Sequence, residues 1–521
     1  MSLIWSENDN RKSFTDLSFF DSLWIKNMFE DCFVRNFGSS GFELSEFLTL
    51  NKDTIKIRNE VFIDLINNRK ILPELKEIVQ ILVDIQQLSY RDEDLDIESE
   101  LYIVKELNMY TDVIKRFHEM FSVAKFTSAP LKRFVSDVES VYDSDDFKTL
   151  CDKSEKLGNK INNIKSITIG VNLDAQLRPI EAGLVSVNDE NYISGNVIDK
   201  ILRLDLGPSV YECIAPLEPI NRNLSTQQKQ VFTRTVNSSL HGVFSKSLNS
   251  WRDAIRKYLK TETSWLTNII SEFRFLVGST EFLLKISDLN YPLCIAEFSE
   301  TEHIKDMYDP GLVLNSDGYR AVLNDLDFDR ESRMYVLTGP NKGGKSVYLM
   351  AVGRMYTLLH LGLLLPAKRA EINTVDHIFI HFPLKNNMTY GKSRFEEECA
   401  QISDINKKIS SNSLFLFDES LSGTNSVESV YIAKEIFSAY AVIGCKGIFS
   451  THLHDMCNVA PEINSSPDVV SRIGNLSALL DPITKERTFK VIKGDSYGKS
   501  FAHDIAVKYN LTKEHILSAK E

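Results

Sequence analysis

A glycine-rich loop between an apolar strand and a helix most constrains what this chain can fold into. Its residues, which fit the pattern G-x-x-x-x-G-K-[ST], are Gly339, Pro340, Asn341, Lys342, Gly343, Gly344, Lys345 and Ser346. The apolar run 334–337 precedes the loop, and a helix-like run begins at Val347. In such an arrangement successive backbone N–H groups point at the β-phosphate of a nucleotide, and the helix adds its positive N-terminal end. Lys345 is then expected to reach the β- and γ-phosphate oxygens, and Ser346 to bind magnesium.

Two carboxylates at the end of a second apolar run favour hydrolysis of the nucleotide over binding alone. The run covers residues 413–417, and Asp418 and Glu419 follow it directly. Because neighbouring side chains of a strand point in opposite directions, the two carboxylates are expected to have separate roles. Asp418 is placed to hold Mg²⁺, directly or through water, and Glu419 to polarise the water that attacks the γ-phosphate.

A third strand-like run, residues 447–450, ends in Thr451 and His452. Ligands of open α/β sheets bind at such strand ends, so His452 is a candidate to contact the γ-phosphate or the attacking water. Each of the three features also has a purely structural explanation: a turn with a surface lysine, a solvated acidic strand end, or a packed histidine. Their occurrence together, in the order that nucleotide hydrolysis requires, favours the functional interpretation.

With these three features in register, the C-terminal part of the chain resembles the ATPase domain of the MutS family of DNA mismatch-repair and recombination proteins. Six segments match patterns of that family: 338–346, 366–372, 391–398, 418–425, 450–452 and 494–502. The resemblance is strong over residues 290–521 and weaker upstream. It implies ATP and Mg²⁺ as cofactors and an ABC-type α/β P-loop ATPase domain.

The resemblance also implies a homodimer whose active sites are shared between the two chains. In the family, the loop that corresponds to residues 391–398 reaches the nucleotide of the partner. Ser393 is therefore expected to contact the γ-phosphate in trans, with Ser422 and Thr424 near the interface. The alternative is local: Ser393 caps the helix that its own loop begins, with Glu396 completing a capping box.

The sequence departs from the family pattern at two places, the phosphate-binding loop and the segment that contacts the adenine base of the nucleotide. Val347 stands where the family usually has threonine, which leaves the magnesium serine in place. Residues 321–323 occupy the position where the family often carries an aromatic residue that stacks on adenine. Asn324 remains as a nucleotide-binding candidate, and Tyr319 is a candidate substitute for the aromatic residue.

Upstream of the ATPase domain, the sequence predicts a mostly α-helical lever domain with a small inserted β-containing, clamp-like segment. The predicted divisions are 1–165 (helical lever), 166–219 (clamp-like insertion), 220–288 (returning lever helices) and 289–521 (ATPase). Helical spacing supports the lever, because Leu101, Val104, Leu107, Tyr110, Ile114, Phe117 and Phe121 recur every three or four residues. Alternation at 167–171 and 184–187 predicts strands in the insertion. The name "clamp" is transferred from the family by position alone.

Composition excludes several classes of protein. The chain has 521 residues and a net charge of −12, so a nucleic acid would have to be bound through local basic patches. Candidates for phosphate contacts are Arg252, Arg256, Lys257 and Lys260, although a solvated helix face is the more common explanation of such a charged run. Seven scattered cysteines without C-x-x-C spacing argue for reduced thiols and against zinc. No signal peptide or apolar run of about 18 residues is found, which predicts a cytoplasmic protein without membrane spans.

Taken together, the sequence predicts a dimeric, DNA-associated MutS-type ATPase in which the nucleotide state moves levers and clamp. No room for the family's mismatch-reading domain is seen before the lever pattern begins, which favours branched DNA over mispaired DNA as the ligand. The alternative is an ATP-gated clamp on a ribosome or a protein assembly, since the same motifs would drive either.

Overall fold

The structure, a computed structural model, describes most of the chain in two compact units. The described residues are 2–9, 14–37, 43–89, 97–152, 165–176, 179–191, 193–194, 212–213, 264–315, 320–382, 393–453, 455–481, 483–484, 486–494, 509–510 and 512–518. One unit, here called the nucleotide unit, combines residues 2–69 with residues 274–521. The other, here called the helical unit, comprises residues 70–273. Among the described helices, none combines the length and the apolar character needed to cross a bilayer.

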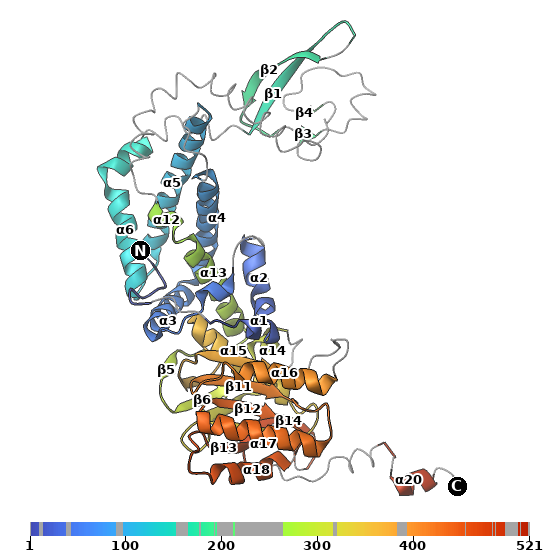
Figure 1. The fold of residues 1–521 in the computed structure, drawn as a ribbon. Coiled ribbons are helices and arrows are strands. Elements are labelled where there is room, and N and C mark those ends of the chain that lie inside the picture. The colour runs from blue at the N-terminus through green and yellow to red at the C-terminus, as the bar shows by residue number, and fades with distance from the viewer. Residues whose placement is uncertain are drawn as a thin grey trace. The chain divides into compact units, whose positions relative to one another are not determined.

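The nucleotide unit is built on a six-stranded sheet with the order β10-β11-β12-β8-β13-β14 (Figure 1). The strands are β8 (Met334–Thr338), β10 (His377–His381), β11 (Ser413–Asp418), β12 (Lys446–Ser450), β13 (Ile473–Leu480) and β14 (Arg487–Lys493). All neighbouring strands are parallel except β13 and β14. Every residue of β8, β11 and β12 is buried, as expected for strands covered on both faces. Because these three strands are parallel, their carboxyl ends lie together at one end of the sheet.

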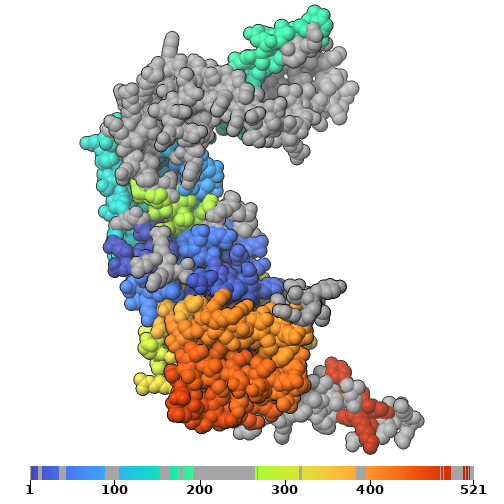
Figure 2. Space-filling view, viewed as in Figure 1, coloured from blue at the N-terminus to red at the C-terminus, as the bar shows by residue number. Residues whose placement is uncertain are grey.

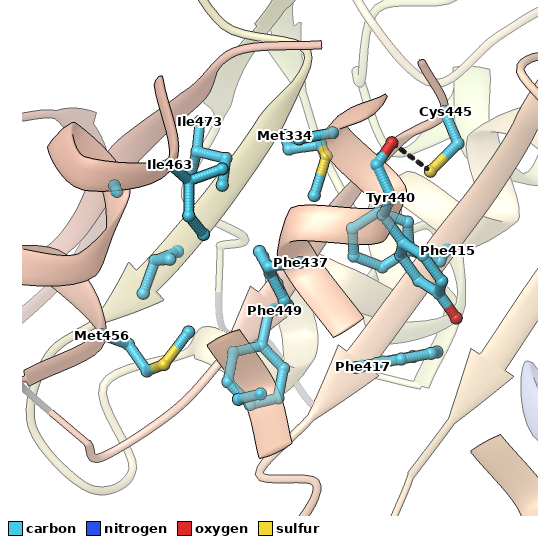
Figure 3. Packing of buried hydrophobic residues seen from close by; sticks show 14 of the residues in the cluster. Met334, Phe415, Phe417, Phe437, Tyr440, Cys445, Phe449, Met456, Ile463 and Ile473 are labelled. Atoms are coloured by element: carbon cyan, nitrogen blue, oxygen red, sulfur yellow. Dashed lines mark hydrogen bonds between the residues drawn. The ribbon is translucent and has the colours of Figure 1, made fainter. Parts of the chain in front are cut away.

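Helices cover both faces of this sheet. On one face lie α16 (Arg394–Asn406), α17 (Ser426–Ile443) and α18 (Asp455–Asn464), and their apolar side chains pack on Phe415, Phe417 and Phe449 (Figure 3). On the other face lies α15 (Lys345–Leu361), whose Gly353 comes so close that a Cβ atom there would be 3.1 Å from Leu416 Cδ1. The predicted α/β P-loop fold class is thereby confirmed.

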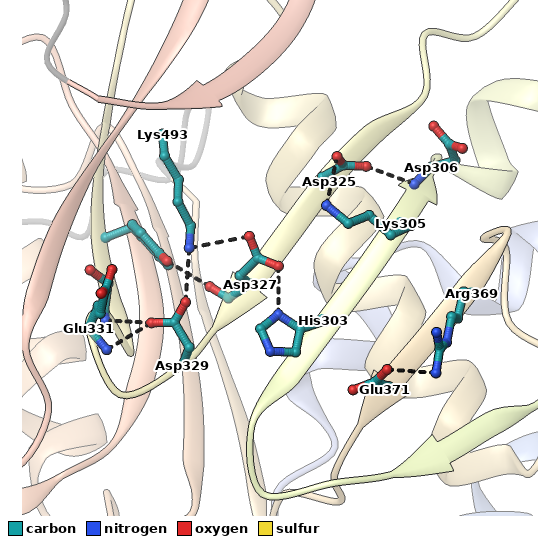
Figure 4. Close-up of polar contacts among 12 residues, drawn as sticks. His303, Lys305, Asp306, Asp325, Asp327, Asp329, Glu331, Arg369, Glu371 and Lys493 are labelled. Atoms are coloured by element: carbon teal, nitrogen blue, oxygen red, sulfur yellow. Dashed lines mark hydrogen bonds and ion pairs between the residues drawn. The ribbon is translucent and has the colours of Figure 1, made fainter.

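A four-stranded sheet with the order β5-β9-β6-β7 lies in the same unit. Its strands are β5 (Ala296–Phe298), β6 (Glu302–Met307), β7 (Asn324–Phe328) and β9 (Arg369–Ile372). Alternate residues of β7 are buried, so Asp325 and Asp327 point to the opposite face (Figure 4). There Asp327 accepts from His303 at 2.9 Å and pairs with Lys493 of β14 at 3.2 Å. This pairing links β14, the edge of the larger sheet, to β7.

Helices from the first 69 residues belong to the nucleotide unit. They are α1 (Ser18–Ser22), α2 (Ile25–Phe37), the 3-10 helix η1 (Leu44–Phe47) and α3 (Lys52–Asn67), and the unit also contains α14 (Pro310–Asn315) and α20 (Lys513–Ser518). Figure 2 shows the blue atoms of this segment against the yellow and orange atoms that follow residue 300. Arg58 and Asn59 of α3 hold the carboxyl end of α15, donating to Leu361 O at 3.0 Å and Gly362 O at 2.8 Å.

The helical unit contains α4 (Leu72–Ser89), α5 (Ile97–Val123), α6 (Ala129–Asp143) and α12 (Ser264–Thr267), and it shares α13 (Ile270–Asp288) and the 3-10 helix η2 (Arg69–Ile71) with the nucleotide unit. The predicted apolar stripe lies on α5. Leu107, Tyr110, Ile114 and Phe117 are buried and Phe121 is half-buried, which confirms the prediction for these residues, whereas the side chains of Leu101 and Val104 lie outside the described part of the chain. Residues 214–263, which include the four basic candidates at 252–260, lie outside the described residues. The division of the upstream region into lever and clamp stays a prediction.

The predicted strands of the insertion form a hairpin of β1 (Ser166–Leu173) and β2 (Pro179–Asn188), and the short strands β3 (Ile193–Ser194) and β4 (Glu212–Cys213) pair with each other. Each hairpin face has its own chemistry, because the register pairs Ile167 with Val187 and Thr168 with Ser186. At this end of the hairpin, Ile167 and Val187 therefore share one face, and Thr168 and Ser186 share the other.

Candidate nucleotide-binding site

The glycine-rich loop has the conformation that a phosphate site requires. Gly339 has φ 141°, and a Cβ atom there would lie 2.9 Å from the backbone oxygen of Ala478, so only glycine fits. Gly344, with φ 92°, forms the N-cap of α15 and turns the chain into the helix. The loop thus ends at a helix N-terminus, where backbone N–H groups and the helix dipole favour an anion.

Lys345 is the first residue of α15 and lies inside this loop. Its Nζ atom donates to Gly339 O at 3.1 Å and to Pro340 O at 3.2 Å, and the residue is 4 % exposed. Burial lowers the pKa of Lys345, and the negative charges of Glu419 and Asp418 oppose that shift. An anionic ligand would act in the same direction as these carboxylates and favour the charged ammonium.

Asp418 supplies an oxygen that fits a magnesium ion. It ends β11, pairs in register with Ser450 of β12, and is 8 % exposed. Its Oδ1 atom is buried and has no hydrogen-bond partner among the described residues. A buried carboxylate oxygen without a protein partner is costly, and Mg²⁺ prefers carboxylate and hydroxyl oxygens. Asp418, together with the exposed hydroxyl of Ser346, therefore has the chemistry to hold this ion.

Glu419 and His452, predicted from separate segments, are brought together by the sheet. Their Oε1 and Nε2 atoms lie 2.6 Å apart, and both side chains are about two-fifths exposed. Glu419 has φ 49°, and its backbone N–H donates to Ser450 O at 2.8 Å, which turns the carboxylate away from the line of β11. Water can therefore reach this pair beside the loop.

A cavity of about 460 Å³ extends from the loop along α15. Its lining includes seven of the predicted site residues: Asn324, Lys342, Gly343, Gly344, Lys345, Ser346 and Glu419. The volume lies in the range of small-molecule and cofactor sites. Asp418 and His452 do not line this cavity, but both lie directly beside Glu419, which does.

Phe489 of β14 is a lining residue that the sequence did not reveal. It is 48 % exposed, and its Cδ1 atom would lie 3.3 Å from a Cβ atom at Gly344, beside the loop. Its φ of 55° is unusual for an aromatic residue and turns it out of the regular strand. The hydrogen bonds that join its strand to the loop and to β7 span 146 and 165 residues. No local pattern around residue 489 could therefore have indicated this position.

Asn324 lines the cavity, but its amide is bound to the backbone. Nδ2 donates to Phe489 O at 3.1 Å, and Oδ1 accepts from Val491 N at 2.8 Å. The side chain therefore fixes β14 to β7 and thereby places the Phe489 ring. Tyr319, the predicted substitute for the missing aromatic residue, lies outside the described residues.

Ser393 forms the capping box that was the alternative to a contact in trans. Its Oγ atom accepts from Glu396 N at 3.2 Å, and its N–H donates to Glu396 Oε2 at 2.8 Å. Ser422 is exposed, and Thr424 donates to Glu428 near the start of α17. The contact of Ser393 with a partner's nucleotide stays a prediction, because a single chain is described.

The chain matches two protein-family models and is similar to several known proteins. Residues 335–521 match the model described as MutS domain V, and residues 51–289 match the model described as MutS2 N-terminal domain. The DNA mismatch repair protein MutS of Chlorobium phaeobacteroides is 32 % identical over 203 residues, 38 % of this chain and 22 % of that protein. MutS of Clostridium kluyveri is 23 % identical over 504 residues, 91 % of this chain and 56 % of that protein. The chain thus spans less than two thirds of the length of these relatives.

Proposed function

This chain belongs to the MutS family, and from that membership and the site geometry we propose that it binds ATP with Mg²⁺ and hydrolyses it. The observation that carries the proposal is the presence of Lys345 and Glu419 in the lining of one cavity, with Asp418 next to Glu419 in the chain and His452 2.6 Å from the Glu419 carboxylate. Arrangements of this kind catalyse phosphoryl transfer by positioning and by electrostatic stabilisation.

Each residue has a distinct part in the proposed reaction. The loop N–H groups and Lys345 bind the β- and γ-phosphates, and Phe489 offers a ring face to the base. Magnesium, when bound through Asp418 and Ser346, neutralises charge on the phosphate oxygens. Glu419 orients and polarises the attacking water, while His452 holds the Glu419 carboxylate by their short contact.

The Glu419→Gln variant tests this proposal. It should keep ATP affinity within about three-fold of the wild type but lower the turnover number by about a hundred-fold or more, because the water loses its polarising carboxylate. Lys345→Ala should instead weaken ATP binding itself. Steady-state phosphate release and a nucleotide titration measure the two effects. An unchanged turnover in Glu419→Gln would contradict the role of Glu419.

We further propose that hydrolysis is coupled to the helical unit and to a nucleic-acid ligand, with branched DNA ahead of a mispair. The chain connects the two units twice: it leaves the nucleotide unit after α3 and returns to it within α13. Both connections support the proposed coupling. α3 is bound to the far end of the phosphate-loop helix by Arg58 and Asn59. A change at the start of α15 therefore has a direct mechanical route to the start of the helical unit.

A second candidate ligand, a ribosome or a protein assembly, is favoured by the charge of the hairpin. Its described residues include one basic side chain, Lys165, against the carboxylates of Asp174, Glu181, Asp189 and Glu190. An acidic hairpin binds DNA phosphates poorly, so contacts with DNA would have to come from other segments.

Defined DNA ligands distinguish the two candidates. If DNA is the ligand, the purified chain should bind branched DNA more tightly than duplex in fluorescence anisotropy, and the affinity should fall steeply with salt. Deletion of residues 166–219 should remove that binding and leave basal ATP hydrolysis within a few-fold. A chain that hydrolyses ATP but binds no branched, duplex or single-stranded DNA at low salt would contradict the DNA proposal. It would also favour the ribosome or protein partner.

A further inference from the structure

The turn that follows β11 is strained on both sides of Ser420. Glu419 has φ 49° and Leu421 has φ 63°, both in the left-handed region that non-glycine residues rarely adopt. Residues in such conformations persist only where the surroundings fix them, and they concentrate at functional sites. Because Glu419 is the proposed water-orienting group, whatever holds this turn also sets the direction of its carboxylate.

Three contacts from three different elements hold the turn. The N–H of Glu419 donates to Ser450 O of β12 at 2.8 Å. At the other end, Ser429 of α17 donates from Oγ to Leu421 O at 2.6 Å. The middle contact is made by Ser420, which is only 1 % exposed and points away from the cavity toward β10.

Ser420 and His381 form a closed pair of hydrogen bonds. His381 Nδ1 lies 2.6 Å from Ser420 Oγ, and Ser420 Oγ lies 3.3 Å from the carbonyl oxygen of His381. The hydroxyl donates to that carbonyl, which leaves its oxygen able to accept from an N–H on Nδ1. Burial lowers the pKa of His381, while the negative charge of Glu398 and a hydrogen bond with Gln401 oppose that shift. His381 is itself 4 % exposed. It is the last residue of β10 and so lies at the same end of the sheet as Asp418, the last residue of β11.

We propose that His381 is a positioning residue for ATP hydrolysis: through Ser420 it fixes the strained turn and so keeps Glu419 beside His452. The inference rests on the proposed function, and it adds a residue that never touches the nucleotide. Its action is indirect, because the imidazole binds Ser420, and Ser420 is the immediate neighbour of Glu419. Loss of this anchor lets the turn relax and moves the carboxylate, while the phosphate-binding loop keeps its own contacts.

The experiment compares turnover number and ATP affinity in four variants of the full chain. His381→Ala and Ser420→Ala each remove one partner, and His381→Asn keeps a side-chain N–H at the position of Nδ1. His377→Ala is the matched control, since it removes an imidazole from the other end of β10, about 13 Å away at 3.3 Å per residue.

His381→Ala and Ser420→Ala should each lower the turnover number by about ten-fold or more, as expected for a misplaced reacting group, with ATP affinity within two-fold of the wild type. His381→Asn should recover most of the rate, and His377→Ala should leave it unchanged. The double variant should be no slower than the slower single variant, because both substitutions break one contact. Ser420→Ala removes a single oxygen atom. It therefore tests whether the His381–Ser420 contact affects the turnover number even if His381→Ala does not fold.

Two results would overturn the inference. Turnover within two-fold of the wild type in both Ser420→Ala and His381→Ala would show that the pair does not set the geometry. A parallel loss of ATP affinity and turnover, without rescue by His381→Asn, would show that the pair only supports the fold. A wild-type chain that binds ATP but does not hydrolyse it would refute the proposed function, which is a separate observation, and the inference with it.

Discussion

Phe489 is the residue on which recognition of the base is expected to depend. Its ring lies in the wall of the cavity beside Gly344, and Asn324 fixes the strand that carries it. Stacking of a base on an aromatic ring contributes about 1–3 kcal/mol. We therefore expect Phe489→Ala to raise the dissociation constant for ATP by about ten-fold or more, and Phe489→Trp to stay within about three-fold of the wild type.

Titration with a fluorescent ATP analogue measures this effect. Ile492→Ala provides the control, because Ile492 lies on the same strand, is 43 % exposed, and is absent from the cavity lining. Equal affinity in Phe489→Ala and in the wild type would mean that the base binds elsewhere in the cavity.

His360, in the last turn of α15, is expected to make the fold sensitive to acid. It is fully buried, its Nδ1 lies 2.9 Å from Thr49 O, and its Nε2 accepts from Val375 N at 3.2 Å. Burial lowers the pKa of His360 to about 4 from its ordinary value of 6.5. The folded state therefore disfavours the protonated ring, and the stability that this residue contributes above pH 6.5 is lost as the pH falls toward 4.

At pH 5 this linkage should lower the free energy of unfolding by about 2 kcal/mol relative to pH 7.5. Urea unfolding at the two pH values measures the difference. In His360→Gln, which cannot take up the proton, the pH-dependent loss should be smaller by about that amount. An identical loss in wild type and variant would assign the acid sensitivity to other groups.

The sequence indicated those site residues that belong to local patterns. The loop, Asp418, Glu419 and His452 each follow a strand, so their neighbours along the chain were enough to predict them. Phe489 and His381 were not predicted, because only the order of strands in the sheet brings their partners close. The hydrogen bond between the strand that carries Phe489 and the loop spans 146 residues, and the one between His381 and Ser420 spans 39. Asn324 was identified, but its bonds to β14 are long-range and could not be foreseen.

Among the elements, α15 is held at both ends. Its start forms the phosphate loop, and its end is bound by Arg58, which donates to Leu361 O, Ile4 O and Phe47 O from a fully buried position. The guanidinium also lies over the rings of Trp5 and Phe275 at 4.2 Å and 5.3 Å.

Arg58→Lys should therefore be strongly destabilising despite keeping the charge. A lysine cannot serve three carbonyls in this fork geometry, and leaving a buried carbonyl without a donor should lower the free energy of unfolding by about 3 kcal/mol. Arg69→Lys is the control, because Arg69 is 63 % exposed in its pair with Asp288, and such pairs contribute about 0.5 kcal/mol. Urea unfolding compares the two, and equal midpoints would contradict a structural role of Arg58.

Periodicity predicted the elements better than it predicted their arrangement. The stripe on α5 and the strands of the hairpin follow from spacing alone, and the structure confirms both. The second sheet β5-β9-β6-β7 was not predicted, since its strands are short, alternate in burial, and are separated by the loop and by α15. The antiparallel edge strand β14 was likewise not predicted.

At the scale of the whole molecule, the predicted homodimer makes each active site depend on two chains. If Ser393 acts in trans, a chain with Lys345→Ala and a chain with Ser393→Arg are each inactive alone. Mixed, they should recover part of the ATP hydrolysis, because one of the two sites in the heterodimer has both residues intact. Phosphate release after co-refolding or co-expression measures the recovery.

The control for this experiment mixes two variants whose substituted residues belong to the same chain's part of the active site. Lys345→Ala and Glu419→Gln both act in cis, so their heterodimer has one defect in each site and should stay inactive. No recovery in the Lys345→Ala and Ser393→Arg mixture would mean that Ser393 serves only as the cap of α16, as its contacts with Glu396 in the single chain show.

The discontinuity of the nucleotide unit has a consequence for synthesis on the ribosome. Its first 69 residues are made early, whereas β13 and β14 end at residues 480 and 493. At about 5–20 residues per second, the N-terminal segment waits roughly 20 to 80 seconds for its packing partners. During that interval the apolar side of α3, with Ile55, Val61 and Phe62, has no completed core to enter. The nascent chain therefore exposes the apolar side chains of its earliest helices until the last strands of the sheet are made.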